Sequence, residues 1–190
     1  MAQEASVGWS DELECEGGQL LVANAGDFAH WFGAPVPIDV AGHDSVHVFG
    51  GGHAGYLWKV PAGAVRVTVD SGRASLWLAQ IEYADNDGER DAAHAYVLAF
   101  DSADGAPGQA YRVESGTVVI ASAASSVGDT STDLAGLPLS AASPGALVDF
   151  ATGPSAAALW LMPGLYESSL FYHEEDRWGV SWCRLERVSD

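Results

Sequence analysis

The sequence predicts a mainly β protein in which two sequence-related β units pack as a sandwich-like body with one or two short helices. Three observations predict this class: phrases that recur in the same order in both halves, apolar residues that alternate with polar ones, and Gly- and Pro-rich turns. With 190 residues the chain can bury a core without disulfides or metals. We expect an N-terminal unit over residues 1–106 and a C-terminal unit over residues 107–190. Each unit should supply one layer of a single compact body.

Three pairs of phrases carry the internal repeat. "LECEGGQLLVANAG", from Leu13, is similar to "YRVESGTVVIASAA", from Tyr111. "LWKVPAGAVRVTV", from Leu57, is similar to "LWLMPGLYESSLF", from Leu159. Each half then ends in an aromatic-rich strand, "SLWLAQIEYA" in the first and "VSWCRLERVS" in the second. The shared order of the three pairs is typical of a duplication.

The strands are predicted from local alternation and from glycine turns. "GGQLLVA" and "SGTVVIAS" each follow such a turn and favour a strand. "AVRVTVD" alternates with period two, so Val65, Val67 and Val69 should face the core. Arg66 and Thr68 should then face water.

Two segments favour a helix, and two others favour irregular structure. "GDFAHWFGAP" predicts a short helix with Asp27 as its N-cap and Gly33 at its end. Residues 88–100 predict a longer helix, whose last turn is equally compatible with a strand. Residues 102–110 are the best candidate for a linker, and residues 122–145 for a long loop.

The net charge restricts the class of partner. Eight Lys and Arg against 26 Asp and Glu give a formal charge of −18. Nucleic acids and anionic membranes are themselves negatively charged, so we expect neither as a partner. The charge suits a basic protein, although solubility, genome composition or a salty cytoplasm explains it equally well.

The cellular compartment is predicted from the cysteines and the N-terminal residues. The chain has two cysteines, Cys15 and Cys183, and begins with an acidic stretch that lacks the apolar core of a signal peptide. We therefore expect a cytoplasmic protein with reduced thiols, a single bridge between the two cysteines being the alternative. No apolar run reaches the roughly 20 residues that a membrane-spanning helix needs.

The sequence contains no convincing catalytic or metal-binding motif. It lacks a G-x-S-x-G nucleophile elbow and the lysine of a phosphate-binding loop, so we expect neither an enzyme nor a cofactor. His43, His47 and His53 lie close to Asp44 in the sequence, but their spacing matches no known ligand pattern. A polar loop is therefore favoured there over a metal site.

Two runs of acidic residues lie near the outer ends of the long hairpins, one run in each half. A glycosidase needs two carboxylates with different pKa values in a cleft, whereas these acids lie in hydrophilic turns. They are either a solvated face or a patch for a basic partner, with a neighbouring aromatic residue as an anchor. The predicted partner-binding residues are Asp85, Asp87, Glu89, Asp91, Glu174, Glu175, Asp176 and Trp178.

Seven tryptophans in a β protein raise the alternative of a carbohydrate-binding or small-ligand-binding module. Sugar rings stack on exposed indoles, so the exposure of these side chains decides between the two functions. We expect a core position for Trp77, Trp160 and Trp182, and a surface position for Trp9, Trp31 and Trp178.

Taken together, these phrases resemble the bacterial family called immunity protein 21, from polymorphic toxin systems. The chain matches the family's opening motif at Glu14 or Glu16 and then at Gly17, Gly18, Leu20, Leu21, Trp31 and Gly33. It differs from the motif at Gln19, where the family favours Pro. "IEYADNDGE" and "MPGLYESSLFYHEEDRWGVSWCRLERV" look like the central and closing strands of that family. The resemblance implies a protein that binds and neutralises a cognate toxin, often a nuclease, in the cytoplasm of the producing cell. It supplies no catalytic residues.

Overall fold

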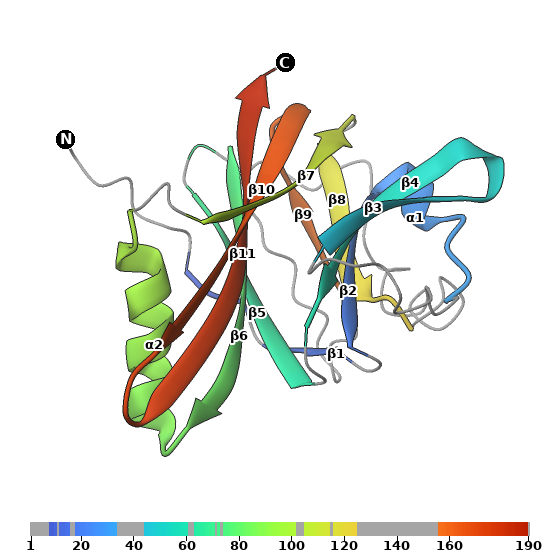
Figure 1. Cartoon of the computed structure of the whole chain (residues 1–190). Coiled ribbons are helices and arrows are strands. Elements are labelled where there is room, and N and C mark those ends of the chain that lie inside the picture. Colours follow the sequence, from blue (N-terminus) through green and yellow to red (C-terminus); the bar gives the residue numbers. More distant parts are fainter. Residues whose placement is uncertain are drawn as a thin grey trace.

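The chain folds into two antiparallel sheets that pack face to face, with two α-helices on the outside (Figure 1). This computed structural model describes residues 8–10, 12–15, 18–33, 44–60, 63–70, 72, 74–101, 105–114, 116–124 and 156–189. The predicted mainly β, sandwich-like class is confirmed. Within the described residues, no helix has the length and apolar character needed to cross a membrane.

The larger sheet has the strand order β1-β5-β6-β11-β10-β7. Its strands are β1 (Leu13–Cys15), β5 (Gly63–Val69), β6 (Ser75–Ala84), β7 (Ala106–Val113), β10 (Gly164–Glu174) and β11 (Trp178–Ser189). The smaller sheet has the order β3-β4-β2-β8-β9. Its strands are β2 (Gln19–Asn24), β3 (Asp44–Phe49), β4 (His53–Lys59), β8 (Thr117–Ser122) and β9 (Ala156–Trp160).

Both halves of the chain contribute strands to both sheets, so the expectation of one layer per half is wrong. β6 pairs with β11 at the centre of the larger sheet, and β2 pairs with β8 at the centre of the smaller one. Each of these pairs joins a strand of the first half to a strand of the second. The alternation of a strand predicts which face is buried, but it does not predict which strand becomes its neighbour.

The phrases that match in the sequence occupy matching places in the sheets. Gly18 and Gly116 have φ values of +78° and +82°, a conformation in which a Cβ is strained. The carbonyl of Gly18 accepts a hydrogen bond from Val60 N at 3.1 Å, and the carbonyl of Gly116 accepts one from Leu161 N at 2.7 Å. Both copies of the phrase therefore need glycine to make the same turn.

The main core lies between the sheets. Val65, Val67 and Val69 are fully buried in it, as predicted, and both cysteines are buried and free. Thr68 was expected to face water, but it is also fully buried. Its hydroxyl donates to the carbonyl of Gly8 at 2.6 Å, because residues 8–10 cover this part of the outer face. The alternation within the strand does not predict that a distant segment covers Thr68.

The outer face of the larger sheet is covered by α2 (Asp87–Ala99), which packs on β6 and β11. The predicted helix is confirmed, and its last turn is helical rather than extended. Trp182 is buried under it, as predicted, while Trp77 is half-buried. The predicted linker over residues 102–110 is wrong for its last five residues, because β7 begins at Ala106.

The outer face of the smaller sheet is covered by α1 (Ala25–Phe28) and the residues after it. The residue before this helix is Asn24 rather than the predicted Asp27, which lies in the first turn.

Trp31 was expected at the surface but is only 2% exposed, and its indole N–H donates to Ala123 O at 3.1 Å. Trp160, expected in the core, is half-buried. Residues 125–145 of the predicted loop lie outside the described residues.

Candidate functional site

The two acidic runs meet at one end of the larger sheet, which we call the acidic end. It consists of the turn between β6 and α2 with the first turns of α2, and the turn between β10 and β11 (Figure 1). Antiparallel pairing of β6 with β11 sets Ala84 opposite Trp178, so the two turns are neighbours. The backbone N–H of Asp85 donates to the carbonyl of Arg177 at 3.2 Å and links them directly.

Some of the acidic side chains at this end stabilise the N-terminus of α2. The side chain of Asn86 caps the helix by accepting from Glu89 N at 3.1 Å. Glu89 in turn accepts from Asp85 N at 3.2 Å and pairs with Arg177 at 3.3 Å. These contacts resemble a capping box, and Asp87 and Glu89 also lie favourably at the positive end of the helix dipole.

Two tyrosines hold the carboxylate of Glu174. The hydroxyl of Tyr83 lies 2.9 Å from Glu174 Oε1 and 2.9 Å from the carbonyl of Glu175, so these two acceptors share its single proton. The hydroxyl of Tyr172 donates to Glu174 Oε2 at 3.0 Å. Partial burial and then the bond to Glu174 raise the pKa of Tyr83 to about 12. The pKa of Tyr172 is raised chiefly by its own bond to Glu174. Both hydroxyls therefore stay protonated and keep donating at neutral pH.

The exposed aromatic residues of the acidic end are these tyrosines rather than Trp178. Tyr83 is 39% exposed and Tyr172 is 54% exposed, whereas Trp178 is half-buried against Tyr96 with ring centroids 5.6 Å apart. His173 stacks on the same Tyr96 at 4.1 Å and contacts Glu175 at 3.1 Å. The two tyrosines were missed in the sequence, although each lies within two residues of an acidic run.

The seven predicted acids divide into two groups. Glu89, Glu174 and Glu175 have the partners just described. The other four are exposed and make no side-chain hydrogen bond or ion pair with another described residue: Asp85, Asp87, Asp91 and Asp176. These four unpaired carboxylates are the groups that a basic partner could neutralise without breaking the fold.

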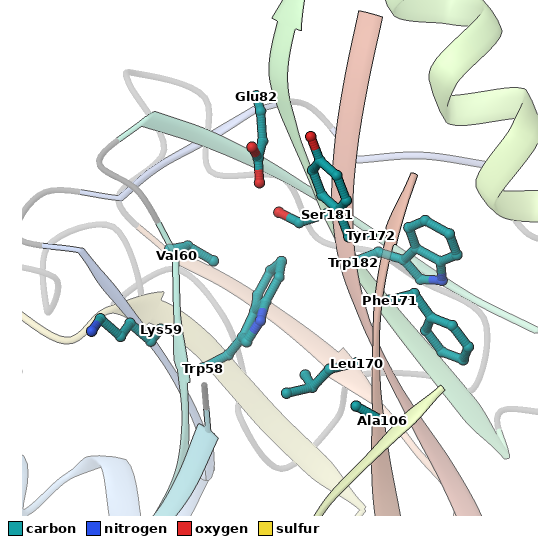
Figure 2. A pocket seen from close by; sticks show the side chains of 10 residues that line it. All are labelled: Trp58, Lys59, Val60, Glu82, Ala106, Leu170, Phe171, Tyr172, Ser181 and Trp182. Atoms are coloured by element: carbon teal, nitrogen blue, oxygen red, sulfur yellow. The ribbon is translucent and has the colours of Figure 1, made fainter. Parts of the chain in front are cut away.

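A cavity of about 660 Å³ lies between the two sheets, where the end of β4 faces β10, β11 and β6 (Figure 2). The indole of Trp58, the ring of Tyr172, the hydroxyl of Ser181 and the carboxylate of Glu82 are turned toward this space. Leu170, Val60 and Ala106 add apolar surface. Phe171 and Trp182 also line it, although their side chains point away across the sheet. No pattern in the sequence marks this cavity.

His47 and His53, two of the histidines considered as metal ligands, have other partners in the structure. His53 pairs with Asp27 at 2.8 Å and stacks on His30 at 3.9 Å, while His47 lies against Trp31. Asp44 is turned elsewhere, accepting from the hydroxyls of Tyr56 and Ser168. His43 lies outside the described residues. Within the described part of the chain, no group of three His, Cys, Asp or Glu side chains could hold a metal ion.

The tryptophans do not provide the exposed platforms that sugar stacking needs. Of the three expected at the surface, Trp31 is buried, and Trp9 and Trp178 are half-buried beneath α2. Trp9 packs on the ring of His94 at 5.0 Å. A carbohydrate site built on those three indoles is therefore not supported.

No protein-family model, curated protein or solved structure matches this chain.

Proposed function

We propose that this protein binds a basic protein partner through its acidic end, and that the partner is a bacterial toxin, which it neutralises in a stoichiometric complex. The observation that carries the proposal is the meeting of two acidic runs from distant parts of the sequence beside two exposed tyrosines. The resemblance to the immunity protein 21 family gives the partner its class. In this proposal the complex forms in the cytoplasm of the producing cell, without catalysis or a cofactor.

In the proposed mechanism, charge sets the association rate and the tyrosines set the dissociation rate. A net charge of −18, with four unpaired aspartates at one end, would steer a basic toxin to that end and raise the association rate. Tyr83 and Tyr172 would then be buried in the interface, where aromatic side chains commonly anchor a complex. The association rate should fall as salt rises, while the dissociation rate should depend mainly on the tyrosines.

The first experiment is neutralisation in cells. The product of the adjacent gene is expressed alone and together with this protein, and surviving cells are counted. Rescue, together with a co-purifying 1:1 complex whose association slows with salt, supports the proposal. Toxicity without rescue contradicts it.

A charge-matched pair of variants tests the acidic end. The first variant replaces the four unpaired aspartates at that end with asparagine, and the control replaces four exposed acids elsewhere, Glu14, Asp101, Glu114 and Glu167, with their amides. Both change the net charge by the same amount. We expect the first variant to lower the association rate at low salt by on the order of tenfold, and the control to lower it much less. Equal effects would mean that overall charge, rather than this end, attracts the partner.

A further inference from the structure

The cavity between the sheets contains a negative charge that the described part of the protein does not neutralise. Glu82 makes no hydrogen bond or ion pair with another described residue, and its charge helps to raise the pKa of Tyr172. Lys59 also lines the cavity, but Figure 2 shows its side chain directed away from Glu82. Because Glu82 is exposed and has no such partner, a cation can form a charge-assisted hydrogen bond with it without breaking a contact of the fold.

The other surfaces of the cavity suit the same kind of ligand. Tyr172 is 54% exposed and offers a ring face, which attracts ammonium and guanidinium groups through its negative π-face. Trp58 is only 3% exposed and adds a small apolar surface. The hydroxyl of Ser181 makes no side-chain hydrogen bond with another described residue, so it can accept one from a bound N–H group. Leu170, Val60 and Ala106 would contact an apolar body.

The size of the cavity and the net charge of the protein also favour a small cationic ligand. A volume of about 660 Å³ is within the range of small-molecule sites and exceeds what a single basic side chain fills. The net charge of −18 raises the local concentration of cations around the whole molecule. A free ligand therefore fits the cavity better than one inserted side chain of a partner.

We propose that this cavity binds a small organic cation, a primary amine or guanidine carried on an aromatic or otherwise apolar body. In the complex the charged nitrogen lies between Glu82 and Ser181, and the apolar body rests against Trp58 and Leu170. This site shares Tyr172 with the toxin interface proposed above, but its carboxylate, Glu82, is not one of the residues assigned to that interface. The binding of a small cation is measured without the toxin, so either proposal can fail without the other.

The test is a charge series on one scaffold, measured by calorimetry with the full chain. Tryptamine is cationic, tryptophol is neutral and indole-3-acetate is anionic, while all three carry the same indole. We expect tryptamine to bind about tenfold more tightly than tryptophol, the gain of a hydrogen bond to a charged group, and indole-3-acetate not to bind. No binding of tryptamine at millimolar concentration, equal binding of all three, or tighter binding of the anion would overturn the proposal.

Three variants locate the binding. Glu82→Gln should remove the preference for tryptamine over tryptophol, and because Glu82 is exposed it should leave the melting temperature unchanged. Glu167→Gln, an equal charge change at an exposed position of β10 outside the cavity, should keep the preference. The variant with four asparagines at the acidic end should also keep it. If that variant loses tryptamine as Glu82→Gln does, the attraction is a general effect of charge and the proposal is wrong.

Discussion

The two outer faces of the sandwich are covered in different ways. On the larger sheet, α2 lies over a cluster of rings in which Trp182 stacks on Phe171 at 5.0 Å and lies 5.1 Å from Phe100. On the smaller sheet, the four-residue α1 lies over a surface made largely of alanine, including Ala121 and Ala158. Large rings fill the space beneath a helix, whereas small side chains allow a short segment to lie close to the sheet. Both helices come from the first half of the chain, yet each covers its sheet by a different kind of packing.

The largest expected effect is on the ring-filled face. Trp182→Ala should destabilise the protein by about 3–5 kcal/mol, because it removes a buried ring that contacts three others. Urea denaturation measures the loss. A change below about 1 kcal/mol would mean that α2 is not tightly packed on the sheet.

The second prediction uses a titrating group on the same face. Burial, followed by the charge of Arg66, lowers the pKa of His94 from 6.5 to about 4. Neutral His94 therefore contributes its full stability above pH 6.5. Below that pH the unfolded chain takes up the proton more readily than the folded one, and stability falls by about 3 kcal/mol as the pH approaches 4.

His94→Gln keeps a polar side chain and removes this titration. The free energy of unfolding, measured by urea denaturation at several pH values, should then be flatter between pH 6.5 and 4 than that of the parent. Identical slopes for the two proteins would show that His94 is not shielded from protons.

The third prediction tests the alanine face. Ala158 is 1% exposed, so Ala158→Leu should cost about 1–3 kcal/mol by overpacking the space under α1 and Trp31. The control is Ala95→Leu on the exposed side of α2, which should change stability by less than about 0.5 kcal/mol. Equal tolerance at both positions would mean that the cover of the smaller sheet is loose.

The smallest expected effect is at the edge of that cover. Asp27→Asn replaces the carboxylate that lies 2.8 Å from His53 Nδ1, where both side chains are partly exposed to water. We expect a loss below about 1 kcal/mol in thermal unfolding, because such pairs gain little over hydration. A larger loss would show that this pair, rather than the packing of Trp31, holds the segment in place.

The sequence predicted features that depend on neighbours along the chain. The burial of Val65, Val67 and Val69 follows from period-two alternation, and the helix that ends at Ala99 follows from its periodicity. Features that depend on distant segments were not predictable in this way. Thr68 is buried because residues 8–10 cross it, and Trp31 is buried because the turn after α1 folds back over β8.

The two candidate sites also differ in how far the local sequence predicts them. Each acidic run is continuous in the sequence and could be identified there, although the contact between Tyr83 and Glu174 requires the pairing of β6 with β11. The cavity is assembled from one to three residues each of β4, β6, β7, β10 and β11, and nothing in the local sequence of any one strand marks it. Its carboxylate, Glu82, lies just before an acidic run and was not distinguished from it.

Both sheets contain strands from each side of the segment between α2 and β7, so a cut in the backbone there would divide both sheets. The central pairs, β6 with β11 and β2 with β8, would then become contacts between two polypeptides. Val22 and Ile120, which match in the repeat, are direct partners across one of these contacts. The fragments would behave as the interlocked subunits of a heterodimer, each leaving an open strand edge in both sheets when alone. The connecting segment thus acts as a tether that supplies each half with its partner at high effective concentration.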